Sequence, residues 1–456
     1  MKRCISQALI GIIGSLSMVS CSLHPIDPHP EPTVVGSANY TVQSTESPSV
    51  KASNWWHAFG RTELESLIEL AFKNNFSIAQ ARYRLTALQA VARQTRSGLF
   101  PSLDLSGNGD NAWLGSDETG WESSIGSAFS WEIDLFQRIA SAAMSAKLEA
   151  EASSATLEAV QLALSAEIAR AYFGAVASQK KIDLLNDQLA TDRKLLELIE
   201  LRLENGVGTN VEVLQQQSRV ADSQTLIPKA EIDLRIFENQ LDVLLGAMPD
   251  GIERVAKHET LDFSTKLPPL GVPADLLMER PDLRAARKLL VAADSAIAEA
   301  IADRLPRFTL QGSYAYAEAS AYSGPLAAIV SGFAQPLLDW GRRKYVVEES
   351  KAVYQERLAA FTQNYLEAVQ SVENALYQEN RQREFILRLQ NRIEILRKTV
   401  EESEARYQQG IDTYLPALNA LQELRDVERD LVDEELNLIR YRIALHRAVG
   451  GPIILP

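Results

Sequence analysis

Residues 121–133 read Trp-Glu-Ser-Ser-Ile-Gly-Ser-Ala-Phe-Ser-Trp-Glu-Ile, and every second side chain from Trp121 onward is mostly large and apolar. The alternate positions hold only small or charged residues, so the stretch has period two with one apolar and one polar face. Aromatic residues near both ends are typical of a strand that crosses a membrane. The alternative is a hairpin strand of a soluble protein, because such strands also alternate.

Three further stretches predict the strands that complete two hairpins. Residues 308–316 alternate clearly, a weaker alternation begins at Leu103, and residues 326–336 alternate least clearly. Four strands cannot close a barrel, and lipid does not tolerate open strand edges, so closure would need neighbouring chains. Eight strands would leave a lumen filled by side chains. Twelve strands from three chains would leave an aqueous opening, so the pattern predicts a trimer if the protein forms a pore.

The predicted strands belong to a unit that occurs twice. Residues 101–107 (Pro-Ser-Leu-Asp-Leu-Ser-Gly) match residues 306–312 (Pro-Arg-Phe-Thr-Leu-Gln-Gly), and two more matches share this spacing. Residues 202–209 match residues 406–413 with the spacing shortened by one. Matches at one spacing indicate a structural module used twice in tandem.

Long helices are predicted after each hairpin. Between residues 138 and 205 there is no proline, and the one internal glycine is Gly174. A continuous helix of this length would reach on the order of 100 Å. Apolar residues recur every 3.5 positions, which predicts coiled-coil packing. The corresponding apolar columns of the two copies are Ile182, Leu189, Leu196 and Leu203, and Ile386, Ile393, Val400 and Tyr407.

These patterns predict how the chain is organised. The five segments are a lipoprotein signal peptide (1–20), a lipidated proline-rich tether (21–54), a first repeat (55–250), a linker (251–273) and a second repeat (274–456). Each repeat begins with a helix. The β-hairpins are expected at about 102–133 and 307–337, and the long helical hairpins at about 138–246 and 343–449.

The N-terminus carries an export signal. A basic start precedes an apolar run over residues 8–16, which is too short to span a bilayer. Met18-Val-Ser-Cys21 then resembles a bacterial lipobox, in which the cysteine is acylated, although leucine is usual where Met18 stands. The alternative is an ordinary signal peptide with a coincidental cysteine. Ser22 after the cysteine favours the outer membrane over retention at the inner membrane.

Composition argues against several classes of function. The only other cysteine, Cys4, lies in the segment to be removed, and the five histidines show no ligand spacing. No metal, cofactor or catalytic thiol is therefore expected. The net charge of −14 becomes about −16 when Lys2 and Arg3 are removed, which disfavours binding to nucleic acid. There is no glycine-rich nucleotide motif or histidine–carboxylate pattern, so no enzymatic activity is predicted.

Several short motifs resemble those of one family in their order and spacing. They are Trp55-Trp-x-x-Phe59 followed by Leu64-x-x-Leu67-Ile68, then Leu244-Leu-Gly246, Arg280-Pro-Asp-Leu283, and the two turns Gly206-Val-Gly-Thr209 and Gly410-Ile-Asp-Thr413. Over essentially the whole mature chain, the sequence resembles the TolC-like outer-membrane factors. It is most similar to the lipidated, NodT-type efflux outer-membrane lipoproteins.

The resemblance implies an α+β membrane protein that forms a homotrimer. Four strands per chain would contribute to a twelve-stranded β-barrel in the outer membrane, and long coiled-coil helices would form a trimeric α-barrel across the periplasm. It implies a passive duct of a tripartite efflux system for drugs or other small molecules. The implied partners are outer-membrane lipid, a periplasmic adaptor (membrane fusion) protein and an inner-membrane transporter of the resistance-nodulation-division (RND) type.

Two other functions remain open at this point. Relatives in the family serve ABC-driven (type I) protein secretion with the same duct. A non-channel, scaffolding coiled-coil lipoprotein would account for the heptads and the lipid, but it leaves the repeated hairpins without a purpose.

The two predicted helix tips are the candidate functional site. Gly206 and Gly410 are expected to end helices, where a left-handed residue is common. Thr209 and Thr413 are expected to cap the returning helices. The resemblance implies that these tips also border the contact with the adaptor.

Asp412 is the candidate pore residue. In similar channels an acidic residue at this place faces the axis, and three symmetry copies make a ring that narrows the pore and favours cations. The alternative is that Asp412 or Thr413 only caps a helix. Related channels often carry a further aspartate where this chain has Asn419, so a second acidic ring is not expected.

Overall fold

The structure is a computed structural model of the chain. It describes residues 24–34, 39–41, 54–114, 117–256, 259–264, 266–268, 270–319 and 322–451. The predicted signal peptide and its cysteine, Cys21, lie outside these residues.

The chain divides into two compact units, and each takes segments from both predicted repeats. The first, here called the strand unit, consists of Met1–Val35, Arg82–Thr156 and Asp282–Gln363. The second, here called the hairpin unit, consists of Gly36–Ala81, Leu157–Pro281 and Asn364–Pro456.

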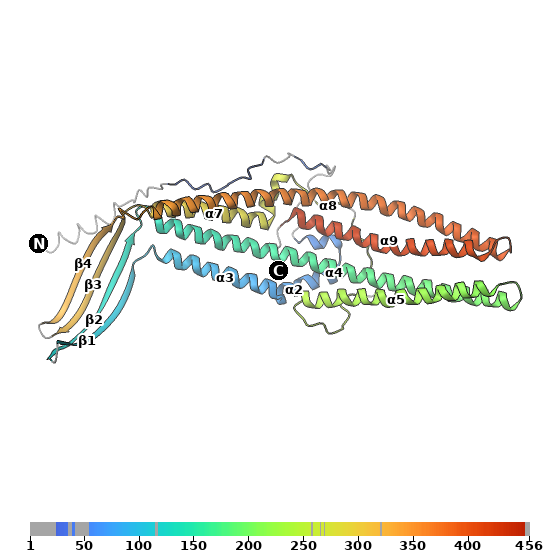
Figure 1. The fold of residues 1–456 in the computed structure, drawn as a ribbon, viewed down its shortest axis with the longest axis horizontal. Coiled ribbons are helices and arrows are strands. Elements are labelled where there is room, and N and C mark those ends of the chain that lie inside the picture. The colour runs from blue at the N-terminus through green and yellow to red at the C-terminus, as the bar shows by residue number, and fades with distance from the viewer. Residues whose placement is uncertain are drawn as a thin grey trace. The chain divides into compact units, whose positions relative to one another are not determined.

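The strand unit holds one antiparallel sheet of four strands in the order β1-β2-β3-β4 (Figure 1). The strands are β1 (Ser102–Leu114), β2 (Asp117–Ile133), β3 (Arg307–Ala319) and β4 (Tyr322–Ala334). The two predicted hairpins pair with each other through β2 and β3, where Ile125 lies opposite Tyr316. The stretch 326–336, which alternates least clearly, nevertheless falls largely within the regular strand β4, which ends at Ala334.

Many of the large apolar side chains of this sheet are exposed. They include Leu103, Leu105, Ile125, Tyr314, Tyr316, Leu326, Ile329, Val330 and Phe333. At one cross-strand pair, a Cβ atom on Gly312 would collide with the ring of Phe129, so glycine makes room for the aromatic side chain. No described helix combines the length and the apolar composition needed to cross a membrane.

Equivalent aspartates cap the two longest helices where they follow the strands. Asp134 accepts hydrogen bonds from the backbone N–H groups of Ile139 (3.1 Å) and Ala140 (2.7 Å) at the start of α4 (Arg138–Glu204). Asp339 accepts from the N–H of Arg343 (3.2 Å) at the start of α8 (Arg342–Gln408). Each helix has 67 residues. This corresponds to about 100 Å, as the sequence predicts.

Two helical hairpins run through the hairpin unit, namely α4 with α5 (Asn210–Leu244) and α8 with α9 (Tyr414–Val449) (Figure 1). The heptad columns largely point into their cores. Ile393, Leu396 and Val400 of α8 pack against Leu421 and Leu424 of α9. The hairpins are therefore held by the coiled-coil packing that the 3.5-residue spacing predicts.

Four short elements accompany these hairpins in the hairpin unit. They are η1 (Trp55–Phe59), α2 (Thr62–Asn74), η2 (Pro273–Asp275) and α6 (Leu276–Glu279). The helices α3 (Phe76–Ser97) and α7 (Pro281–Ala302) precede β1 and β3. Trp55 of η1 is buried and its indole N–H donates to Ser165 Oγ of α4 at 3.0 Å. The adjacent Trp56 is also buried in this core.

Candidate functional site

The candidate site consists of the two helix tips in the hairpin unit, where α4 turns into α5 and α8 turns into α9 (Figure 1). Gly206 and Gly410 both have a φ of 72°, the left-handed region that favours glycine. After each glycine, the next backbone N–H donates back to the helix it leaves. Val207 donates to the Arg202 carbonyl (2.9 Å), and Ile411 donates to the Arg406 carbonyl (3.0 Å). The same turn therefore occurs twice.

The two returning helices are capped differently. Thr209 forms a capping box with Glu212: the threonine Oγ1 accepts from the Glu212 N–H (3.4 Å), and Glu212 Oε2 accepts from the Thr209 N–H (3.0 Å). Thr413 stands at the corresponding position of α9, but its side chain makes no capping hydrogen bond. The expectation that Thr413 caps through its side chain is therefore wrong. Pro416 takes the place of Glu212 and has no N–H to donate.

Asp412 is engaged with α8 and not with the start of α9. Its Oδ2 accepts from Arg406 Nε at 2.5 Å, with 38% of the Asp412 side chain and 44% of the Arg406 side chain exposed. The hydrogen bond from Arg406 holds the pKa of Asp412 below its usual range. Sequence reasoning missed Arg406 as its partner. The sequence signal for this ion pair was a basic residue six positions before Asp412, on the other side of the glycine turn.

Aromatic side chains join the two tips inside the hairpin unit. The rings of Tyr407 and Tyr414 have centroids 5.3 Å apart, and the guanidinium of Arg202 lies 4.4 Å above the Tyr407 ring. Ile199 and Val213 belong to the same buried cluster. The ends of all four helices thus share one small core behind the turns.

A buried polar network lies further along the same helices. The fully buried Asp192 of α4 accepts from Ser223 Oγ (2.7 Å) and pairs with Arg425 of α9. Gln216 of α5 donates to the Asp192 carbonyl (2.9 Å) and accepts from the Tyr414 hydroxyl (2.5 Å). Removing one partner of a buried ion pair costs about 3–5 kcal/mol, so this network ties α4, α5 and α9 together.

The sequence did hold a signal for this network. Leu185 and Ile199 share one column of the heptad, and Asp192 occupies the position midway between them. A charged residue at a core position of a coiled coil is costly unless it is paired, and such residues specify register. The signal predicts a partner but not its identity, because Arg425 is 233 residues away.

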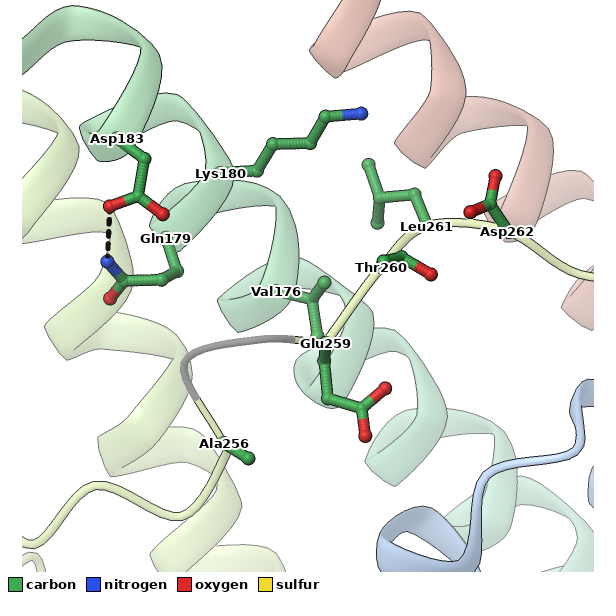
Figure 2. Close-up of a pocket in the computed structure, with 9 residues that line it drawn as sticks. All are labelled: Val176, Gln179, Lys180, Asp183, Ala256, Glu259, Thr260, Leu261 and Asp262. Atoms are coloured by element: carbon green, nitrogen blue, oxygen red, sulfur yellow. Dashed lines mark hydrogen bonds between the residues drawn. The ribbon is translucent and has the colours of Figure 1, made fainter. Parts of the chain in front are cut away.

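A hollow of about 300 Å³ lies between α4 and the segment that follows α5 (Figure 2). Gln179 Nε2 of α4 donates to Asp183 Oδ1 at 3.1 Å, while Glu259 and Asp262 line the opposite wall. Within the described ranges, no group of three or more histidine, cysteine or carboxylate side chains could hold a metal ion. The arrangement is that of a polar surface hollow.

The comparisons with known proteins decide the family. Residues 67–247 and 272–451 match the model of the outer membrane efflux protein family. The chain belongs to this family. The two matched segments together span both copies of the repeat.

Similar proteins cover nearly the whole chain. The pyoverdine export outer membrane protein OpmQ of Pseudomonas putida is 28% identical over 96% of both chains. Nodulation protein T of Rhizobium leguminosarum is 26% identical over 99% of this chain and 95% of its own. Among solved structures, CusC has a TM-score of 0.86 at 22% identity, covering 94% of this chain and all of CusC. The Neisseria gonorrhoeae outer membrane channel MtrE has a TM-score of 0.87 at 22% identity, covering 95% of this chain and 99% of its own.

As an outer membrane efflux protein, the chain is a channel component of an efflux system and is located in the outer membrane. These findings confirm the predicted family, the α+β fold of long helices with four strands, the function and the location. Members of the family are channel proteins. The roles assigned to Gly206, Thr209, Gly410, Asp412 and Thr413 remain predictions.

Proposed function

We propose that the protein is the passive, trimeric outer-membrane duct of a tripartite efflux system and has no enzymatic activity of its own. Three chains would place twelve strands in a closed β-barrel and their helices in an α-barrel across the periplasm. The acylated Cys21 would anchor each chain, and the two tandem repeats would supply equivalent halves of the duct. Exposed apolar side chains on the strands support a lipid-facing surface.

The proposed partners are an adaptor protein and an RND-type transporter. Apolar side chains that are exposed at both helix tips support a contact with these partners. Val207 and Val211 of the first tip are 66% and 62% exposed, and Ile411 and Leu415 of the second are 57% and 50% exposed. Exposed apolar groups at a corresponding place on two tips favour a protein contact. Thr209 and Thr413 would border it, and Gly206 and Gly410 would keep the turns compact.

The proposed cargo is a small molecule. Relatives carry names that refer to the export of pyoverdine, toluene and antibiotics. Their chains align over at least 87% of this one, which supports a shared class of cargo. The proposed Asp412 ring would favour cations at the entrance without selecting a compound.

A photoreactive residue at Thr209 or Thr413 in cells, followed by mass spectrometry of the captured partner, tests the assembly. Capture of an adaptor encoded with a proton-driven pump is expected. An adaptor encoded with an ABC transporter would move the function to protein secretion. The matched control is the same residue at Asp233, an exposed position of α5 that is 24 residues from Thr209. No periplasmic partner at either tip would count against the duct.

A further inference from the structure

The connection from β4 to α8 exposes three large apolar side chains. Leu337 and Trp340 are 92% and 88% exposed, and Leu338 is exposed as well. In the equivalent connection from β2 to α4, Phe136 instead packs on Phe308 of β3, with ring centroids 6.5 Å apart. Only the second connection therefore presents an apolar surface that the described residues leave uncovered.

Trp340 has a backbone conformation that suits glycine. Its φ is 56°, in the left-handed region where a bulky side chain is strained. Hydrogen bonds on both sides fix the connection: Asp339 Oδ1 accepts from the Gly341 N–H (3.1 Å), and Gln335 Nε2 donates to the Arg304 carbonyl (3.1 Å). Burial within the described chain does not offset the strain at Trp340, which points to a partner outside it.

Exposed basic residues gather at the same end of the sheet. Because the sheet is antiparallel, all four strands join their helices at one end, here called the helical end (Figure 1). The exposed cations come from the end of α3, from the segment before β3 and from the start of α8. They are Arg93, Arg96, Arg304, Arg342 and Lys344.

Several carboxylates at the helical end are already engaged. Glu132 accepts from Arg138 Nη2 (2.8 Å), and Asp303 accepts from Arg343 Nε (2.9 Å). Asp339 accepts from the backbone N–H of Arg343 at the start of α8. The exposed cations therefore give the helical end an excess of positive charge, although the whole chain has a net charge of −14.

The far end of the sheet has the opposite sign. Asp110 and Glu122 are directly opposite each other on β1 and β2, and Glu318 of β3 is opposite Ser123. Residues 98–137 and 308–341 contain no lysine or arginine. The positive charge is thus confined to the end of the sheet where the apolar connection lies.

The charges favour lipid over a second copy of the chain as the partner. A second copy is the alternative because β1 and β4 are open edges. The helix that precedes β1, α3, contains four arginines and no carboxylate, so the two edges would bring like charges together. Anionic phospholipid headgroups would neutralise these charges instead, and tryptophan favours the boundary between headgroups and acyl chains.

The apolar connection also continues the apolar face of the sheet. Phe333 lies four residues before Leu337, is exposed, and is opposite Phe308 with ring centroids 6.2 Å apart. Exposed side chains of this kind support the proposed lipid-facing surface of the strands.

We propose that the helical end of the sheet is a binding surface for anionic phospholipid. Leu337, Leu338 and Trp340 insert among the acyl chains, and Arg304 and Arg342 contact the phosphates. The inference rests on the proposed function, in which the helices lie in the periplasm. The bound lipid then belongs to the inner leaflet of the outer membrane.

A nitroxide label at Leu338→Cys tests the insertion, on full-length protein in vesicles of phosphatidylethanolamine and phosphatidylglycerol. The mature chain has no thiol besides Cys21, and labelled wild type gives the background. We expect oxygen, which concentrates in lipid, to relax the label at least threefold more than a water-soluble nickel chelate. Glu401→Cys, at an exposed position of α8, is the matched control and should show the reverse. A label that behaves like the control, or one that neither reagent reaches because a second copy covers it, would overturn the insertion.

Spin-labelled lipids test the headgroup contact. Wild type should associate with phosphatidylglycerol in preference to phosphatidylcholine, and the double variant Arg304→Gln with Arg342→Gln should lose at least threefold of that preference. Lys194→Gln with Lys398→Gln removes the same charge from exposed positions in the hairpin unit and should change nothing. Equal preference in all three proteins would refute the contact. Ion conductance of the same samples reports the duct separately, so the lipid surface and the proposed function can fail independently.

Discussion

Single side chains set the arrangement of charge at the tip between α8 and α9. Asp412 and Arg406 form an ion pair across the glycine turn, and both side chains remain accessible to solvent. In the proposed trimer, three carboxylates would be accompanied by three guanidinium groups. The net field of the ring would then be weaker than that of three free aspartates.

Asp412→Ala is expected to raise the single-channel conductance or to weaken the preference for cations, because it removes the negative group of each pair. Arg406→Ala is the companion variant and should strengthen cation preference by leaving the carboxylate unpaired. For both variants, the single-channel conductance and the reversal potential in a salt gradient are measured across a planar bilayer. If Asp412→Ala leaves both values unchanged, the aspartate acts only within the turn.

His446 is an uncharged histidine inside the core of the hairpin unit. Its ring stacks on Trp55 with centroids 5.4 Å apart, and its Nε2 has no hydrogen-bond partner among the described residues. Burial, and then the nearby positive charge of Arg442, lower the pKa of His446 from 6.5 to about 3. A folded-state pKa below the unfolded value means that the histidine's contribution to stability is complete above pH 6.5 and is lost toward pH 3.

We therefore expect acid to destabilise the wild type more than His446→Phe, which keeps an aromatic ring on Trp55. At pH 5 the histidine should cost about 2 kcal/mol relative to neutral pH, since only the unfolded chain takes up the proton. Thermal unfolding followed by circular dichroism at pH 7 and pH 5 gives the comparison. His29→Gln, at an exposed histidine, is the control. An equal loss of stability in wild type and His446→Phe would contradict the assignment.

The two helical hairpins have the same turn, but their returning helices begin differently. α5 begins with a complete capping box, whereas α9 begins with Thr413 and has Pro416 in place of the residue that would complete the box. Loss of an N-cap costs about 1 kcal/mol, so the same substitution should have different effects at the two tips.

Thr209→Ala is expected to speed amide exchange in the first turn of α5 about fivefold, which corresponds to a loss of about 1 kcal/mol. Thr413→Ala should leave the first turn of α9 almost unchanged, because no side-chain hydrogen bond is lost there. Exchange measured on both variants in one experiment makes each tip the control for the other. Equal acceleration at the two tips would show that Thr413 also caps in solution.

Outer membrane efflux proteins are channels, so the assembly of several chains around one pore is the property on which the proposed function depends. The four strands of the described residues leave two sheet edges, and lipid favours the closure of such edges by other chains. The purified protein should therefore run as a heat-resistant trimer and conduct ions in a planar bilayer. A monomer without conductance would instead support the scaffolding alternative. Boiled protein is the control for both measurements.

The sequence alone was sufficient for the repeat, the four strands, the long helices and the turns at Gly206 and Gly410. These features depend on residues close together along the chain, where a period of two or 3.5 and the backbone preferences of glycine and proline act directly. The same locality applies at Thr413, because Pro416 stands only three residues further on and has no N–H with which to complete the cap.

Only the tertiary structure decided which distant side chains meet. Asp192 pairs with Arg425 across 233 residues, and His24 meets Asp294 across 270. The heptad places Asp192 in the core, but no periodicity identifies Arg425 as its partner, because the packing of whole helices decides which buried charges meet. The periodicities of the sequence thus determined the elements, and its short motifs indicated the family, while the pairings that join those elements appeared only once the chain was folded.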